Sequence, residues 1–257
     1  MMRLGGRSLQ TIARAVLQPR HYRAALNMMQ GYHQPWEVLY RYLSGAGVYP
    51  WDVRVRTPLG WFNPTLFSHH DLLTLNEIFC RLDYRLDPVP QVVVDLGANI
   101  GLSGLYFLTR APTVRCHLYE PVPQNLERLE ANLGRVRERA TLNPYAVGDA
   151  EGEVEFGIEP SGRYGGIGVA TGHSIVVRCR SINSVLEDIL AREARIDLLK
   201  IDTEGAEERT VRAIDTAYLE RIGAIYLEAR PPLPLLPGRF RQEQYGEVVR
   251  LYNSEWQ

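Results

Sequence analysis

The chain has 257 residues and a formal net charge of -1, a length and balance that fit one α/β domain with an appendage. This charge gives no global attraction to nucleic acid, and no apolar run approaches the roughly 18 residues that a transmembrane segment needs. Cys80, Cys116 and Cys179 are odd in number and lack metal-ligand spacing, so we expect buried thiols in a soluble, cytoplasmic protein.

The first 51 residues are predicted to form a helical N-terminal arm, followed by the main domain at 52–257. Residues 1–36 contain no acid, and the apolar positions of 8–18 recur at helical spacing up to Pro19. Further helices are predicted at 22–29 and from Pro35 to Gly45. The arm either covers one side of the core, which we favour, or offers a basic face to a membrane, an anionic partner or a second subunit of a homodimer.

Residues 52–67 alternate between apolar and polar side chains, which predicts a small hairpin. Val53, Val55 and Thr57 share one face of the first strand, residues 58–60 turn the chain, and 61–67 return with an interruption at Pro64. The polar residues 68–71 then predict the capped start of a helix that continues to residue 79.

The stretch VVVDLGANIG at 92–101 predicts a strand that is buried on both faces and runs into a tight turn. Gly97 and Gly101 permit a backbone that a Cβ would forbid, and a helix is predicted at 102–109. A second strand is predicted at 114–119. It ends at Glu120, about 20 to 25 residues past the glycines, where an acid can bind a ribose diol.

The spacing of this turn, D-x-G-x-N-x-G, departs from the G-x-G-x-x-G pattern of nicotinamide and flavin sites. We associate it with S-adenosylmethionine binding, and together with Glu120 it favours an adenosyl cofactor over a purely structural turn.

After Glu120 the sequence predicts a helix at 121–134 and a third sheet strand at 141–147. Strands at 154–157 and 174–180 are predicted to form a hairpin insertion. The glycine-rich residues 159–173 between them are either a mobile lid or a disordered surface excursion.

A helix at 181–194, a strand at 196–202, a helix at 203–217 and a strand at 224–229 complete the predicted α/β pattern. Lys200 lies inside a strand that should be buried, so its ammonium needs a partner. Four acids lie at the carboxyl ends of predicted parallel strands, the edge where such sheets bind ligands. They are Asp95, Glu120, Asp202 and Glu228.

After residue 229 the sequence predicts only one more strand, within 247–253, because a proline-rich segment follows residue 230. We therefore expect either a shortened sheet or a chain that lacks part of the acceptor pocket.

Four blocks resemble the FkbM-type family of S-adenosylmethionine-dependent methyltransferases. They are VVVDLGANIG, HLYEPVPQNLERLEANL, NPYAVGDAEGEVEF and IDLLKIDTEGAEERTVRAI, and the match covers roughly residues 71–229. The resemblance implies a class I methyltransferase fold, a Rossmann-like, mostly parallel sheet with helices on both faces. It also implies methyl transfer to a hydroxyl oxygen, commonly on a sugar or a secondary metabolite. One departure is Asn183, where the family pattern has an aspartate.

The resemblance also implies roles for individual residues. The methionine half of the cofactor would be held by Asp95, Gly97, Ala98, Asn99 and Gly101, and its ribose by Glu120 with Pro121 beside it. The adenine would lie near Ala146, Val147 and Asp149. Asp202 and Glu204 would sit where the cofactor meets the acceptor.

Methyl transfer to an alcohol requires positioning and a group that removes the hydroxyl proton. Glu204 and Asp202 are the first candidates for this base, Lys200 is a candidate if burial lowers its pKa, and His173 on the predicted lid is another. For Lys200 a structural role, neutralising the acids, is favoured. A divalent metal held by Asp202, Glu204 and Glu228 is a different solution.

Two other functions remain open at this point. The same fold would suit a nucleotide-dependent oxidoreductase, which the glycine spacing disfavours, and a non-catalytic binding protein that retains the methyltransferase fold. The acceptor itself is expected to be a small molecule or a glycan.

Overall fold

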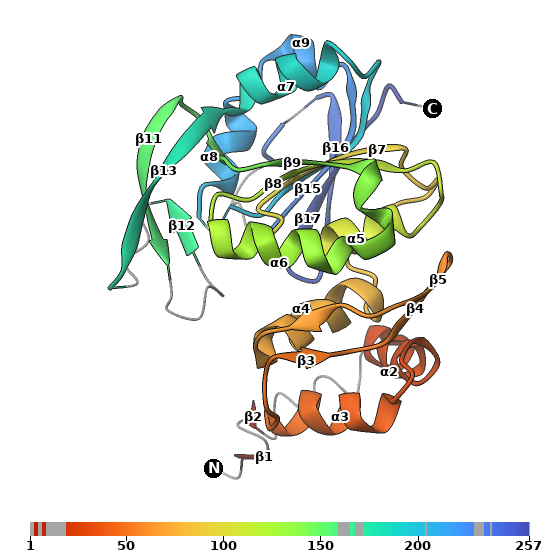
Figure 1. Cartoon of the computed structure of the whole chain (residues 1–257). Coiled ribbons are helices and arrows are strands. Elements are labelled where there is room, and N and C mark those ends of the chain that lie inside the picture. The colour runs from red at the N-terminus through yellow and green to blue at the C-terminus, as the bar shows by residue number, and fades with distance from the viewer. Residues whose placement is uncertain are drawn as a thin grey trace. The chain divides into compact units, whose positions relative to one another are not determined.

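A computed structural model describes residues 3–4, 7–8, 19–158, 165–167, 172–203, 205–228, 234–236 and 238–256. The chain forms two compact units, Met1–Arg85 and Leu86–Gln257, each of which is described by itself (Figure 1). The functional division predicted after residue 51 stays a prediction. No helix in the described ranges combines the length and apolarity that crossing a bilayer requires.

The first unit consists of three helices and short strand pairs. The predicted helices are confirmed as α2 (Pro19–Gly31), α3 (Pro35–Ser44) and α4 (His69–Phe79), whereas the helix predicted at 8–18 lies outside the described residues except for Ser8. α3 ends at Gly45, which adopts a left-handed conformation with φ 71°. α4 begins with a capping box, in which Asp71 N donates to Ser68 Oγ and Ser68 N donates to Asp71 Oδ2.

The hairpin predicted in this unit forms two separate ladders. β3 (Trp51–Asp52) pairs with β6 (Thr65–Leu66), and β4 (Val55–Thr57) pairs with β5 (Gly60–Phe62). A further short pair joins β1 (Arg3–Leu4) to β2 (Arg7–Ser8).

A seven-stranded sheet forms the centre of the second unit, in the order β16-β17-β15-β14-β7-β8-β9. The strands are β7 (Val92–Leu96), β8 (Arg115–Tyr119), β9 (Ala140–Asn143), β14 (Ile196–Ile201), β15 (Ile222–Glu228), β16 (Phe240–Tyr245) and β17 (Val248–Asn253). Among these strands β17 alone runs opposite to the other six, so its pairings with β15 and β16 are antiparallel. The expectation of a shortened sheet is therefore wrong, because two strands follow β15.

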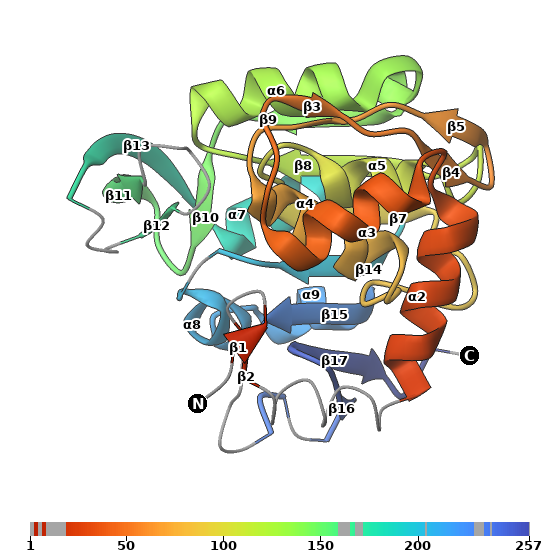
Figure 2. The same ribbon diagram turned by 90° about the horizontal axis from the view of Figure 1, so that it is seen from below.

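Helices cover both faces of this sheet, as predicted. α5 (Leu102–Leu108) and α6 (Pro123–Leu133) lie on one face, and a 3-10 helix (Gly134–Arg139) follows α6. α7 (Ile182–Leu190) and α9 (Thr216–Leu219) lie on the other face (Figures 1 and 2). α8 (Glu207–Arg212) contributes Val211 to the core on the α7 side. The single helix predicted at 203–217 is thus two short helices.

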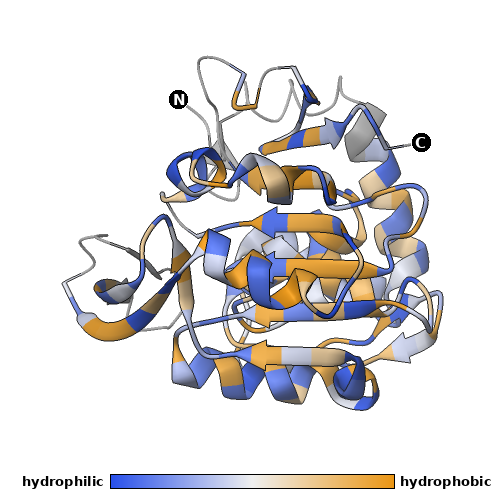
Figure 3. Cartoon of the chain, turned by 90° about the horizontal axis from the view of Figure 1, so that it is seen from above, coloured by the Kyte–Doolittle hydropathy of each residue, from blue (hydrophilic) through white to orange (hydrophobic). Residues whose placement is uncertain are grey.

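The apolar strands form the core, as their unbroken runs of apolar residues predicted (Figure 3). Val94, Leu96, Leu199 and Ile201 pack with α7 residues such as Ile182, and all are fully buried. Each such side chain contributes about 1.5–3 kcal/mol to folding, so this face of the sheet is a rigid support for whatever its edge carries.

A smaller four-stranded sheet, in the order β10-β13-β11-β12, extends from the domain. Its strands are β10 (Ala146–Gly148), β11 (Gly152–Ile158), β12 (Gly165–Ile167) and β13 (Ser174–Ser181). The predicted hairpin is confirmed in the antiparallel pairing of β11 with β13. The strand predicted at 141–147 is instead two strands in different sheets, because Pro144 has no N–H with which to continue a ladder. Apart from β12 and residues 172–173, the predicted lid lies outside the described residues.

Asn183, the departure from the family pattern, joins α7 to the segment between α8 and α9. Its amide nitrogen donates to Ala213 O at 2.9 Å, and its amide oxygen accepts from Asp215 N at 3.0 Å. A carboxylate cannot donate the first of these bonds, so the amide suits this position. The three cysteines are buried thiols, as predicted.

Candidate active site

The four acids predicted at the strand ends lie on adjacent strands of the central sheet. Asp95 is the penultimate residue of β7, Glu120 follows β8, Asp202 follows β14 and Glu228 ends β15. Because these strands are neighbours and parallel, the four residues share one edge of the sheet. The sequence prediction of a carboxylate-rich edge is confirmed.

Lys200 joins two of these acids inside the sheet. It pairs in register with Asp95, and its Nζ donates to Asp95 Oδ1 at 2.9 Å and to Gly97 O at 3.2 Å. Asp202 Oδ2 lies 3.2 Å from the same nitrogen. The three protons of the ammonium therefore meet three acceptors.

These contacts keep Lys200 charged. Burial alone would lower its pKa, but Asp95 and Asp202 raise the pKa above the ordinary lysine value. The geometry thus favours the structural role of Lys200 over its role as a base.

Asp95 is fully buried, with both carboxylate oxygens occupied by the protein. Oδ1 accepts from Lys200, and Oδ2 accepts from Ser103 Oγ at 2.5 Å. Asp95 therefore fixes the strand end to α5, while direct contact between Asp95 and a cofactor stays a prediction. Ser103 was missed because nothing in its sequence position distinguishes it from an ordinary helical serine.

The glycine turn is packed tightly against the end of β14. Gly97 has φ 80°, and a Cβ built there would stand 1.8 Å from Asp202 O. Asn99 also has a positive φ, 47°, and Gly101 has φ 86° with the Leu129 side chain 3.0 Å from a built Cβ. Only glycine fits at position 97, so the structure explains this residue of the motif.

Most of the amides in the turn already donate to oxygens of the protein. Gly97 N and Ala98 N both donate to Tyr119 O, at 3.0 and 2.9 Å, and Gly101 N donates to Ala98 O. Asn99 N donates to Glu120 Oε2 at 2.9 Å. These four N–H groups consequently offer no cradle for a phosphate, in contrast to dinucleotide-binding turns.

What the turn does present is acceptor oxygens. Asn99 Oδ1 is buried and has no hydrogen-bond partner among the described residues. Glu120 is 5% exposed, and its carboxylate accepts from Asn99 N and from Val122 N. A carboxylate accepts about four hydrogen bonds, so with a third contact from the Asn125 side chain it retains room for one further donor.

The surroundings of Glu120 also shift the pKa of its carboxyl group. Burial raises its pKa to about 7, although hydrogen bonds from Val122 and Asn99 oppose the shift. A buried acid poised near neutral pH at a sheet edge is typical of a ligand-binding or catalytic group.

The residues predicted near adenine lie in β10 and its flanks. Ala146 and Val147 are buried in two different apolar clusters, so their side chains are packing residues here. Asp149 pairs with Arg209 Nε of α8 at 3.0 Å, and Pro121 is half-buried beside Glu120. Their contact with a cofactor stays a prediction.

The candidate bases are not all brought together. Asp202 lies at the edge with 28% of its side chain exposed. His173 is exposed and directly precedes β13, in the small sheet and not at the edge of the central one. Glu204 lies outside the described residues.

Sequence reasoning missed two neighbours of Glu204. Glu207 is 7% exposed, and its carboxylate accepts from the backbone N–H groups of Thr203 and Gly205. Thr203 Oγ1 is buried and has no hydrogen-bond partner in the described part of the chain. The sequence marked Glu207 only as the last glutamate of the EGAE block. The direction of its side chain depends on the conformation of the backbone that precedes it.

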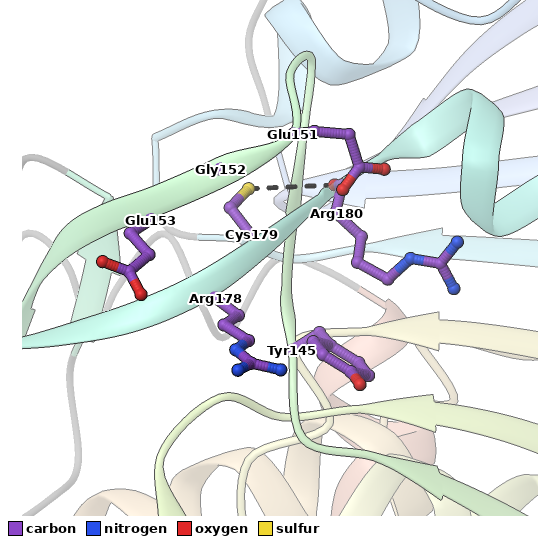
Figure 4. Close-up of a pocket in the computed structure, with 7 residues that line it drawn as sticks. All are labelled: Tyr145, Glu151, Gly152, Glu153, Arg178, Cys179 and Arg180. Carbon is purple, nitrogen blue, oxygen red and sulfur yellow. Dashed lines mark hydrogen bonds between the residues drawn. The ribbon is translucent and has the colours of Figure 1, made fainter.

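A cavity of about 390 Å³ lies on the small sheet, away from these residues (Figure 4). It is lined by Tyr145, Glu151, Gly152, Glu153, Arg178, Cys179 and Arg180. One of its arginines has an acidic partner, since Arg180 Nη1 lies 2.7 Å from Asp188 Oδ2, and Arg178 and Glu153 occupy opposite register positions on β13 and β11. None of the sequence-predicted site residues lines this cavity.

The described residues contain no group of three or more histidine, cysteine or acidic side chains arranged to hold a metal ion. Because Glu204 is not among them, the predicted set of Asp202, Glu204 and Glu228 stays a prediction.

Comparison with known proteins agrees with the resemblance found in the sequence. Residues 95–250 match the methyltransferase FkbM domain. The chain is 33% identical over 218 residues to the AMB antimetabolite synthetase AmbE of Pseudomonas aeruginosa, covering 65% of this chain but only 10% of that protein. It is 28% identical over 186 residues to the 31-O-demethyl-FK506 methyltransferase FkbM of Streptomyces tacrolimicus, covering 59% of this chain and 72% of that protein.

Among solved structures, a precorrin-6y C5,15-methyltransferase from Geobacter metallireducens aligns over 73% of this chain and 89% of its own, with a TM-score of 0.40 and 15% identity. The match to the FkbM domain extends from the buried Asp95 at the glycine turn to β17, and so includes the whole carboxylate edge. This chain therefore belongs to the FkbM methyltransferase family.

Proposed function

We propose that this protein is an S-adenosylmethionine-dependent O-methyltransferase that acts on a hydroxyl group of a sugar, a polysaccharide or a secondary metabolite. The observation that carries the proposal is the pair of acceptor groups at the glycine turn, Asn99 Oδ1 and the Glu120 carboxylate. S-adenosylmethionine bears an ammonium group and a ribose diol, which are donors that these acceptors suit.

The same turn argues against a dinucleotide-dependent oxidoreductase. A pyrophosphate is bound by unoccupied N–H groups at the start of a helix. The amides of Gly97, Ala98, Asn99 and Gly101 instead donate to Tyr119 O, to the Glu120 carboxylate and, for Gly101, to Ala98 O. No comparable observation favours a non-catalytic binding protein.

A relative's activity supports the choice of oxygen as the acceptor atom. The FkbM protein of Streptomyces tacrolimicus is a 31-O-demethyl-FK506 methyltransferase, an enzyme named for methylation at an oxygen. Because the match covers only about a tenth of AmbE, the acceptor and the cellular location of this protein are also part of the proposal. We propose a small-molecule or glycan acceptor and a cytoplasmic location.

The bound cofactor would supply an activated methyl group, and the protein must orient the acceptor and remove its proton. Asp202 is the described candidate for the base, because it is partly exposed at the edge and a carboxylate can receive the proton. Glu204, two residues further on, is the other carboxylate of this loop. Lys200 holds Asp202 in place and is itself protonated.

Titration calorimetry with S-adenosylmethionine, S-adenosylhomocysteine and NAD tests the proposal directly. We expect both adenosyl compounds to bind, NAD to fail, and Asn99→Ala to weaken binding of the amino-acid half by about tenfold. Binding of NAD alone would refute the proposal.

Turnover is tested by mass spectrometry of extracts from cells with and without the protein, in search of a product that is about 14 mass units heavier, the increment of one added CH2. Repeating the reaction with a chelator separates proton removal by Asp202 and Glu204 from assistance by a divalent metal. Undiminished turnover under chelation would exclude the metal alternative.

A further inference from the structure

Glu207 lies at the start of α8 but binds the loop that precedes the helix. Its Oε1 accepts from Thr203 N and Gly205 N, both at 2.9 Å, and its Oε2 also lies 2.9 Å from Gly205 N. An N-cap side chain accepts from N–H groups of the first helical turn, and a capping-box acid accepts from the N-cap N–H, whereas Thr203 and Gly205 both precede the N-cap residue Ala206. The carboxylate therefore fixes the conformation of the loop, not the end of the helix.

The loop that Glu207 holds leads directly from the carboxylate edge. Asp202 N donates to Leu96 O at 3.0 Å, which attaches the first residue of the loop to the end of β7. Asp202 O packs against Gly97 so closely that no side chain fits between them. One end of the loop is thus set by the glycine turn and its middle by Glu207.

We propose that Glu207 is a positioning residue for methyl transfer, which holds the backbone of Thr203 and Gly205 so that the Thr203 hydroxyl, next to Asp202, faces the bound ligands. This inference rests on the function proposed above and extends it to a residue that does not itself touch the reacting atoms. Its support is the burial of Glu207, its three contacts with loop amides, and the buried Thr203 Oγ1 without a hydrogen-bond partner in the described residues.

A side-chain acceptor is needed for this task. Hydrogen bonds from backbone N–H groups to a charged carboxylate are roughly twice as strong as those between neutral groups. Gly205 has φ 100° and lies outside any helix or strand, so no regular backbone hydrogen bonding fixes its conformation. Without the carboxylate, the amides of Thr203 and Gly205 would be left without their acceptor, and the loop would sample other conformations.

Glu208 provides a matched control on the same helix. It is adjacent in sequence, carries the same charge, and pairs with Arg212 at 2.9 Å on the surface, where 45% of its side chain is exposed. Glu208→Gln therefore removes an equal charge from the same helix turn without touching the loop. Ile189→Ala, which truncates a buried side chain of α7, controls for a general loss of stability.

The first measurement is amide hydrogen exchange of the ligand-free protein at residues 203 and 205. We expect exchange to accelerate by about tenfold or more in Glu207→Ala, by less in Glu207→Gln, and by under about twofold in Glu208→Gln. Unchanged exchange in Glu207→Ala would overturn the inference, whatever the cofactor proves to be.

The second measurement is the affinity for S-adenosylhomocysteine by titration calorimetry. Binding should weaken by about tenfold or more in Glu207→Ala, with partial rescue in Glu207→Gln, while Glu208→Gln and Ile189→Ala stay within about twofold of the wild type. An equal loss in Ile189→Ala would assign the effect to stability and overturn the inference. If the wild type does not bind, the proposed function fails, and the exchange experiment alone decides whether Glu207 holds the loop.

Discussion

Replacing Lys200 by methionine separates its structural role from a catalytic one. Methionine keeps the length of the side chain but leaves the fully buried Asp95 with only Ser103 as a hydrogen-bond donor among the contacts described above. Two unit charges 2.9 Å apart attract by about 6 kcal/mol at an effective dielectric constant of about 20, and desolvation offsets part of this. Removing one partner of a buried pair typically costs about 3–5 kcal/mol, which is the loss of stability we expect near neutral pH.

The dependence of this loss on pH follows from Asp95. Burial already raises the pKa of Asp95 above its ordinary value, against the attraction of Lys200, so without the lysine the pKa rises further. A carboxyl group whose folded pKa is raised stabilises the fold at low pH and loses that contribution as the pH rises through the folded pKa. The deficit of Lys200→Met should accordingly be smaller at about pH 5 than at about pH 8.

Hydrogen exchange of the β7 and β14 amides at these two pH values measures the effect in the unit that contains the pair. The double variant Lys200→Met, Asp95→Asn leaves no buried charge at this site and should recover at least about 1–2 kcal/mol. This reasoning would be refuted if the unfolding free energy of Lys200→Met lay within about 1 kcal/mol of the wild type at about pH 8. An equal loss of stability at about pH 5 and about pH 8 would refute it as well. If stability were kept while turnover vanished, Lys200 would be the base instead.

Gly97→Ala should abolish cofactor binding, because the added methyl group would overlap the Asp202 carbonyl oxygen. Gly134→Ala is the control for backbone strain alone, because Gly134 has φ 51° and open space around a built Cβ, and titration calorimetry measures the cofactor affinity of both variants. Since the pKa of Glu120 is about 7 and donors favour its ionised form, cofactor affinity should rise between about pH 6 and pH 8 with proton release, and Glu120→Gln should remove this dependence. Thr203→Val should leave the melting temperature unchanged or raise it while weakening ligand binding, and equal affinity would contradict a ligand contact. Asn183→Asp should lower the unfolding free energy by about 1–2 kcal/mol in chemical denaturation, because its side chain then loses the donor of one hydrogen bond.

The central strands could be predicted because parallel strands buried on both faces need unbroken apolar runs. β7 begins with such a run at Val92, Val93 and Val94, and the apolar residues of β14 are interrupted only by Asp197 and Lys200, so the bounds of both strands were found to within a few residues. β16 was missed for the opposite reason, since its sequence FRQEQY is that of an exposed edge strand whose side chains give no apolar signal. The division between β9 and β10 was missed because a sequence pattern does not specify which sheet a strand joins.

The acids of the site could be predicted from their places at strand ends, but their hydrogen bonds could not. Glu204, Glu207 and Glu208 lie within five positions, and only the backbone conformation at Gly205 determines that Glu207 turns back toward the loop. Glycine permits a positive φ but adopts negative values as readily, so the sequence alone does not predict the φ of Gly205. The hydrogen bonds by which Glu207 holds the loop could therefore be found only from the structure.

Asp95 and Glu120 are both buried carboxylates at one edge of the sheet, but they differ in the groups that contact them. Asp95 has a cation within 2.9 Å, so its charge is balanced by the protein and a ligand gains little by approaching it. Glu120 receives backbone N–H groups, which stabilise its charge without balancing it, and its pKa stays near 7. A ligand that donates hydrogen bonds lowers the free energy of the ionised form of Glu120 and has no such effect at Asp95. For this reason we propose that the ribose binds at Glu120, whereas Asp95 fixes the end of β7 to Lys200 and Ser103.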